Sequence, residues 1–184
     1  MNLAFDEVKA TQTAAVFLRL AGGSLQYLAL IKLLYKADRE ALRRWGLPIT
    51  TDRYASLKFG PVTSQIYDLI KASGTPGAHP TFWSRHIGKR GQYTVSLTAD
   101  PGDSEMSRAE NRLIIELFAA DGAKDGFTLA EETHRDFPEW KDPGESSTPI
   151  EISEILEALQ VSEDEASHTE SAIAAQRAAR DLAI

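Results

Sequence analysis

The pattern of apolar and polar positions predicts a chain built mainly of helices. Apolar residues recur at three- and four-residue steps through two N-terminal segments, 5–20 and 25–45. This spacing is typical of a helix that buries one face. In the second segment, charged side chains occupy the opposite face. Gly22-Gly23 marks the end of the first helix, and Gly46 followed by Pro48 marks the end of the second.

The middle of the chain predicts a third helix and one β-hairpin. Residues 49–59 show no helical period, so we expect an irregular or short extended passage there. Pro61 suits the first position of a helix predicted over 61–72. Two runs rich in β-branched and aromatic residues, 81–87 and 92–98, flank a Gly-Lys-Arg-Gly turn and predict the hairpin.

Capping signals and a change of composition organise the C-terminal half. Ser107–Glu110 and Thr128–Glu131 have capping-box spacing and predict two further helices, the second ending before Pro138. The segment 150–184 predicts two more helices, but the last is Ala-rich with few large apolar residues. Because an isolated helix of this kind is marginal in water, we expect it to pack on the domain, on a second copy or on a partner.

Together these elements predict a mainly α fold. We expect a compact multi-helix domain over residues 1–140 with one small β-hairpin, then a linker over 141–149, and an acidic, Ala-rich C-terminal helical extension over 150–184. We also expect the domain to fold without the extension, because the extension has no core of its own.

Composition narrows the class of protein. The 184 residues include no cysteine, which excludes disulfides and thiolate metal sites and suits a reducing compartment. No run approaches the roughly 20 apolar residues that span a bilayer, so we expect a cytoplasmic protein without a membrane segment. The net charge of −7 is uneven: residues 1–99 hold 13 Lys and Arg against 6 Asp and Glu, and residues 100–184 hold 7 against 21. An acidic half can repel nucleic acid, mimic it, or cover a basic surface of a partner.

The sequence offers no catalytic or metal-binding motif. The four histidines lack the spacing of metal ligands, and no Gly-rich phosphate loop or nucleophile elbow occurs. We therefore expect no enzymatic activity, no cofactor and no metal. Asp38 stands out because it falls on the apolar stripe of the second helix. A carboxylate there should be hydrogen-bonded or paired, for instance to an Arg or to the amides of a helix N-terminus; the alternative is a partner-facing acid.

Aromatic and basic residues are interleaved between residues 27 and 67, a composition found at protein interfaces and at nucleic-acid sites. We expect Tyr54 and Lys58 to be the best contact candidates, because they lie in the irregular passage. The full set of predicted partner contacts is Lys32, Lys36, Arg39, Arg43, Tyr54 and Lys58.

Residues 28–62 resemble the signature of Panacea-domain proteins, the family of SocA-like antitoxins of bacteria and phages. The resembling pieces are Lys32–Tyr35, Ala37–Arg39, Gly46 with Pro48-Ile49, Asp52, Tyr54-Ala55 and Gly60–Val62 leading into Ile66-Tyr67, with Thr133-His134 and Trp140 as a weaker closing motif. The resemblance covers about residues 5–140. It marks six positions as structural: Tyr35, Asp38, Gly46, Pro48, Gly60 and Pro61.

The resemblance implies an antitoxin that binds a cognate protein toxin and neutralises it by direct contact, in a toxin–antitoxin pair. It leaves open a proteolytic adaptor that delivers the toxin to a protease, and it leaves open a homodimer or a hetero-oligomer with the toxin. A second hypothesis comes from the residues: helices followed by a hairpin with Lys89-Arg90 suggest a winged-helix regulator that binds operator DNA, with Arg85, Lys89 and Arg90 on phosphates.

Overall fold

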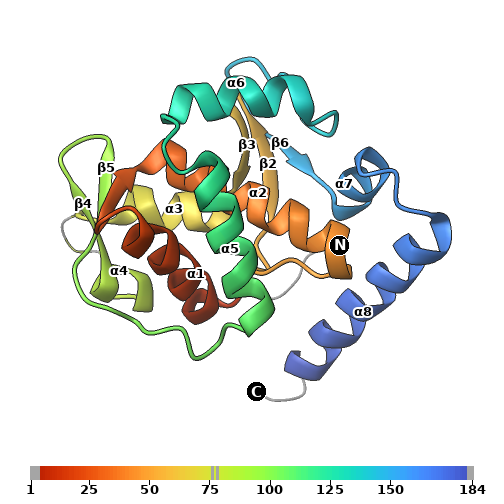
Figure 1. Cartoon of the computed structure of the whole chain (residues 1–184), viewed down its shortest axis with the longest axis horizontal. Helices are drawn as coiled ribbons and strands as arrows, with labels where there is room; N and C mark the ends of the chain where they lie inside the picture. Colours follow the sequence, from red (N-terminus) through yellow and green to blue (C-terminus); the bar gives the residue numbers. More distant parts are fainter. Residues whose placement is uncertain (1–4, 76, 78, 182–184) are drawn as a thin grey trace.

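The two N-terminal helices form where the apolar pattern predicts them. The computed structural model of the chain describes residues 5–75, 77 and 79–181. Helix α1 (Glu7–Leu20) begins at Asp6, whose carboxylate accepts a hydrogen bond from the N–H of Lys9. Helix α2 (Tyr27–Trp45) ends at Gly46, which is left-handed with φ of 72°. Helix α2 lies at the centre of the domain, in contact with α1, α5, α6 and strand β3 (Figure 1).

A first three-stranded antiparallel sheet has the order β1-β5-β4, from strands β1 (Ser24–Gln26), β5 (Thr94–Leu97) and β4 (Ile87–Arg90). The predicted hairpin therefore exists, but its first strand is displaced. Most of the run 81–87 forms a short helix instead, α4 (Phe82–His86). Thr81 and Ser84 form a capping box there, and Trp83 is fully buried, so capping and burial outweigh the β-propensity of the run.

A second antiparallel sheet, not predicted, has the order β3-β2-β6, from strands β3 (Gly60–Thr63), β2 (Tyr54–Leu57) and β6 (Thr148–Ile150). Pro61 pairs with Ser56 in this sheet, so its assignment to the first position of a helix is wrong. β3 lies at the sheet edge, where a proline without an N–H is tolerated. Helix α3 (Ser64–Ala72) starts only after β3 ends.

The remaining helices are α5 (Arg108–Asp121), α6 (Gly126–Asp136), α7 (Ile152–Ala158) and α8 (Glu163–Asp181). The capping box at Ser107 and Glu110 is confirmed. Helix α6 starts earlier than predicted, because Asp125 and not Thr128 is its N-cap. Residues 182–184 of the predicted last helix lie outside the described residues. The described part of the chain thus has eight helices and two small sheets, which confirms the mainly α fold.

The C-terminal segment packs on the domain. A second hydrophobic cluster, beside the main core, joins Tyr35, Leu42 and Tyr54 to aliphatic side chains of the segment. Those side chains are Ile150, Ile152, Ile155, Leu156 and Ile173. Figure 1 shows α7 and α8, in blue, at one side of the molecule. Residues 148–149 of the expected linker lie in β6. The division into domain, linker and extension stays a prediction, but the extension shares a core with the domain.

Two further findings concern metal binding and membrane-spanning helices. Among residues 5–75, 77 and 79–181, no three His, Asp or Glu side chains are grouped so that they could hold a metal ion. None of the helices in the described part of the chain has the length and apolar character needed to cross a membrane.

Candidate functional site

The carboxylate of Asp38 attaches the middle of α2 to the loop that follows this helix. Oδ1 accepts hydrogen bonds from the backbone N–H groups of Ile49 (2.9 Å) and Thr50 (2.8 Å). Oδ2 accepts from the hydroxyls of Thr50 and Tyr54. Burial raises the pKa of Asp38 to about 6, against the effect of the hydrogen bonds from Thr50 and Tyr54. Asp38 is therefore hydrogen-bonded as predicted, but to loop amides and hydroxyls, not to an Arg.

The helix N-terminus that the sequence offered to Asp38 is instead capped by Asp52. Its carboxylate accepts hydrogen bonds from the N–H groups of Gln65 and Ile66, both at 2.9 Å, at the start of α3. These donors explain why α3 begins after Thr63, since a carboxylate at this point favours a helix start. Burial raises the pKa of Asp52, while the hydrogen bonds from these amides oppose the change.

Lys32 is a buried lysine with no acidic partner among the described residues. Its Nζ donates a hydrogen bond of 2.7 Å to the carbonyl oxygen of Pro61. The side chain is fully buried, and burial lowers the pKa of Lys32 to about 7. A Cβ atom at Gly60 would lie 2.8 Å from Lys32 Nζ and 2.6 Å from Thr133 Oγ1. The Gly60-Pro61 turn thus needs a glycine to approach α2 and α6 this closely.

His134 and Trp140 also contact the β2–β3 hairpin. Their rings stack with centroids 3.9 Å apart and planes at 14°. Trp140 Nε1 donates to the carbonyl oxygen of Leu57, at the end of β2, over 2.9 Å. Burial, and next the charge of Lys32, lower the pKa of His134. The closing motif of the resemblance therefore fixes the hairpin that carries Gly60.

Glu139 binds two side chains of α2. Its Oε1 accepts from the hydroxyl of Tyr35 (3.0 Å) and from Nε of Arg39 (2.7 Å). The guanidinium of Arg39 also lies over the ring of Phe137, 4.2 Å from its centroid. Burial raises the pKa of Tyr35 well above its ordinary value. Arg39 is thus engaged inside the domain.

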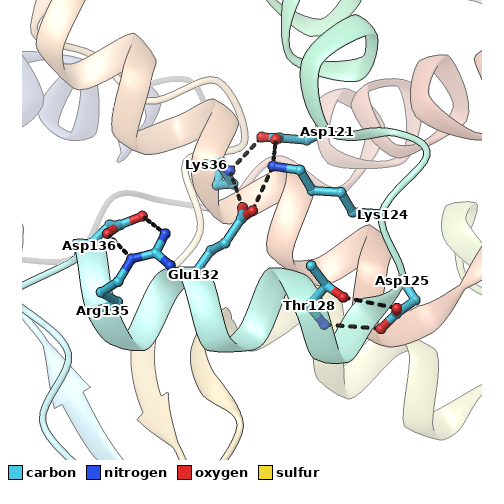
Figure 2. A network of polar contacts seen from close by, with 8 residues as sticks. All are labelled: Lys36, Asp121, Lys124, Asp125, Thr128, Glu132, Arg135 and Asp136. Carbon is cyan, nitrogen blue, oxygen red and sulfur yellow. Dashed lines mark hydrogen bonds and ion pairs between the residues drawn. The ribbon is translucent and has the colours of Figure 1, made fainter.

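Figure 2 shows a charged network that joins three helices around Lys36 of α2. Lys36 pairs with Asp121 of α5 and lies 3.5 Å from Glu132 of α6. Lys124 completes the network, 2.6 Å from Asp121 and 2.7 Å from Glu132. Burial by itself would raise the pKa of Asp121, but hydrogen bonds from Lys124 and Lys36 lower it. The network satisfies the charge of Lys36 internally.

A comparison with protein-family models matches residues 30–141 to the Panacea domain of SocA-like antitoxins. The matched range is more than half of the chain and contains all the polar contacts described so far in this subsection. The chain belongs to the SocA-like antitoxin family. Searches of curated proteins and of solved structures gave no match. The resemblance inferred from the sequence is confirmed, while α1 and the segment after residue 141 lie outside the matched range.

The positions marked as structural in this Panacea domain all make internal contacts. Tyr35, Asp38, Gly60 and Pro61 make those described above. Gly46 ends α2, and a Cβ atom there would lie 2.6 Å from Oγ1 of Thr169 in α8. Pro48 is buried directly before Ile49, whose amide binds Asp38. Their placement gives each of these six residues a structural role inside the chain.

Burial divides the six predicted partner contacts. Lys32 and Tyr54 are 0% and 3% exposed, so their assignment to a contact surface does not hold in this structure. The polar groups of both side chains have hydrogen-bond partners in the interior. Lys32 donates to the carbonyl oxygen of Pro61, and the hydroxyl of Tyr54 donates to Asp38. Lys36 and Arg39 enter the internal pairs described above.

Two of the predicted contacts remain at the surface. The side chains of Arg43 and Lys58 are 54% and 56% exposed. Arg43 pairs with Glu40 on the same helix, and Lys58 pairs with Glu145. Exposed pairs of this kind contribute little to stability, so both cations can exchange partners at small cost.

An exposed aromatic pair lies beside Lys58. Phe59, between β2 and β3, and Phe127, at the start of α6, have ring centroids 5.8 Å apart in an edge-to-face arrangement. The two residues are 50% and 61% exposed. We call this pair the aromatic patch. The sequence placed Phe59 in the aromatic cluster but did not single out Phe127. Its signal is its place in the first turn of an amphipathic helix, away from the face that buries Leu129.

Proposed function

We propose that this protein neutralises a protein toxin by direct contact and that the aromatic patch is the centre of that contact. Membership of the antitoxin family supports the role. The patch supports the location, because aromatic side chains are enriched among the residues that contribute most to protein interfaces. We propose that the role needs binding alone, without catalysis or a cofactor, and that it is carried out in the cytoplasm.

The observation that carries the proposal is an exposed aromatic pair on a rigid support. The turn with Phe59 is held by the bonds from Lys32 to Pro61 and from Trp140 to Leu57. Phe127 follows the N-cap Asp125, which accepts from its N–H at 2.9 Å. Fixing contact residues before binding reduces the entropy lost on association.

Co-expression with the product of the adjacent open reading frame tests the proposal. We expect that product to arrest growth by itself and to be harmless with this chain. A Phe59→Ser/Phe127→Ser variant should fold, because both rings are largely exposed, and should bind the toxin at least about tenfold more weakly. Trp45→Ser is the control, because Trp45 is also exposed, at 38%. It lies 13 residues after Lys32 on α2 and therefore roughly 20 Å along the helix from the residue that holds the turn with Phe59.

Separate outcomes contradict separate parts of the proposal. If the adjacent product is not toxic, the antitoxin role is wrong. If the double variant protects and binds like the wild type, the role stands but the aromatic patch is not the contact. Immunoblots of the toxin distinguish blocking from delivery to a protease, since delivery lowers the amount of toxin whereas blocking leaves it unchanged.

A DNA-binding role is the second candidate, and one observation favours it. Arg90 on the β4–β5 hairpin is exposed and makes no ion pair with any described residue. Lys89 beside it is also exposed. A gel shift with the protein's own promoter over a salt series tests this role: phosphate binding predicts a steep salt dependence, and Arg90→Ala should reduce its slope by about one. Binding whose strength does not change with salt concentration would exclude the DNA-binding role.

A further inference from the structure

Helices α1 and α5 pack side by side (Figure 1). Side chains of both helices line an open groove of about 570 Å³. The floor of the groove is apolar. Val16 is buried there, while Leu20 and Ile115 are 39% and 52% exposed, among the most exposed large apolar residues of the described chain. Such exposure costs solvation free energy unless another molecule covers it.

The rim of the groove is cationic. Arg19, Arg108 and Arg112 line it, against one carboxylate, Asp103. Arg19 pairs with Asp100 at 2.5 Å. Arg108 and Arg112 are exposed and make no ion pair or hydrogen bond with any described residue. Most other basic side chains of the described chain have such a partner, so these two are available to an acidic ligand.

The position of these arginines on α5 is unfavourable to the helix itself. Arg108 is the first residue of α5, and Arg112 follows four residues later. At the first helical position Arg108 opposes the helix dipole, an effect that falls off within the first turn. Two like charges spaced by four residues also repel each other. Ile115 continues the same face at i+7. The helix thus presents two arginines and an isoleucine along one face. The two arginines do not stabilise the helix, so its stability does not explain their presence.

From this combination we propose that the α1–α5 groove binds an amphipathic helix of a partner protein, one that presents large aliphatic side chains flanked by carboxylates. An apolar stripe would fill the floor, and its flanking acids would pair with Arg108 and Arg112. The surface is separate from the aromatic patch, and the proposal does not depend on the toxin contact. Residues 16–20 also lie outside the range that the family model matches.

Other occupants fit the groove less well. A nucleic-acid backbone would leave the apolar floor without contacts and would face Asp103. The acidic helix α8 of a second copy has the charge but not the apolar residues. Among its described side chains the one large aliphatic residue is Ile173, which is buried against the domain of its own chain.

Fluorescence anisotropy with the full chain and designed peptides tests the proposal. The probe is a labelled helical peptide with a leucine stripe flanked by glutamates; a second peptide carries lysines in their place. We expect the Leu/Glu peptide to bind saturably, and Arg108→Glu/Arg112→Glu to weaken it at least about tenfold. The same variant should gain binding of the Leu/Lys peptide. Ile115→Ser should weaken binding of the Leu/Glu peptide to the wild-type protein. It should also weaken binding of the Leu/Lys peptide to the Arg108→Glu/Arg112→Glu variant.

Matched controls separate binding from folding. Arg53→Glu/Arg90→Glu makes the same change of charge at two exposed arginines elsewhere and should leave binding of the Leu/Glu peptide within about twofold. Arg108→Glu/Arg112→Glu should melt close to the wild type, because both side chains are exposed and an acid in place of Arg108 favours the helix N-terminus. The proposal is overturned by absence of saturable binding, by equal losses in both double variants, or by a single-stranded oligonucleotide that displaces the peptide and binds more tightly.

Discussion

Replacing Asp38 by alanine removes the acceptor of four hydrogen bonds. The backbone N–H groups of Ile49 and Thr50 cannot turn to other partners, whereas the hydroxyls of Thr50 and Tyr54 can rotate. A buried donor left without a partner costs roughly 1–3 kcal/mol, and relief from burying a carboxylate offsets part of this loss. We therefore expect Asp38→Ala to lower the free energy of unfolding by about 3 kcal/mol.

Thermal melting followed by circular dichroism measures the effect. For a chain of this size, 1 kcal/mol corresponds to roughly 2–4 °C, so Tm should fall by about 6–12 °C. Asp68→Ala is the matched control, because this carboxylate is 66% exposed and pairs with Lys71 on the same helix. Its loss should change the free energy of unfolding by less than about 0.5 kcal/mol.

Asparagine at position 38 separates hydrogen bonding from charge. The amide oxygen can still accept from Ile49 and Thr50, so Asp38→Asn should lose much less stability than Asp38→Ala. The folded-state pKa of Asp38 is raised from 3.8 to about 6. The folded protein then binds more protons than the unfolded chain between these pH values, so the contribution of Asp38 to stability falls as pH rises through about 6. The variant should lack this component.

One result would refute the structural role of Asp38. If Asp38→Ala melts within about 0.5 kcal/mol of the wild type but no longer binds the partner, the residue contacts the partner and does not hold α2 to its loop. A fall in Tm with the expected size supports the contacts described here, whatever its effect on binding.

Three further predictions concern the rest of the domain. The sequence predicted a domain that folds without the extension, but the shared hydrophobic cluster reverses this expectation: truncation after Pro149 should leave an insoluble or molten protein, because it removes several buried aliphatic side chains at roughly 1.5–3 kcal/mol each. Truncation after Gln160 should leave a cooperative thermal transition. Equal melting of the two truncated proteins would contradict this. The lowered pKa of Lys32 makes the unfolded chain bind more protons than the folded protein between about pH 7 and 10.5, so the stability of the wild type should rise over this range. Lys32→Met should abolish this rise, and urea unfolding across the same pH range measures it. Asp121→Asn should cost about 1–2 kcal/mol by the same assay, and a value near zero would show that the network of Figure 2 is not coupled to stability.

The sequence predicted best where one periodic signal was long. Helix α2 has apolar residues through five turns, and its predicted end at Gly46 is confirmed. Prediction was poorer where two short signals competed. Thr81–Ile87 looked like a strand, but a capping box and the burial of Trp83 make most of it a helix. Pro61 suited a helix start, but pairing with β2 places it in a strand.

The candidate site was also predicted only in part. The sequence marked Asp38 as a buried acid, because its neighbours at three and four residues are apolar. It could not name the donors, since Thr50 and Tyr54 reach Asp38 only when the loop folds back on α2. It placed Lys32 and Tyr54 at a surface because Lys32 belongs to the interleaved aromatic and basic residues and Tyr54 lies in a passage predicted to be irregular. Phe127 was missed, since its nearness to Phe59 depends on a contact between α6 and the hairpin.

The sequence by itself thus determined the helical class, the family and the residues that build its core, because these depend on periodicity and on an ordered motif within about 35 residues. The tertiary structure decided which charges are free. Lys36, Arg39 and Arg112 look alike along the chain, yet the first two meet carboxylates 85 or more residues away, and the third meets none among the described residues. Charge pairing over such separations is a property of the packed helices, and it is what separates structural cations from those left for a partner.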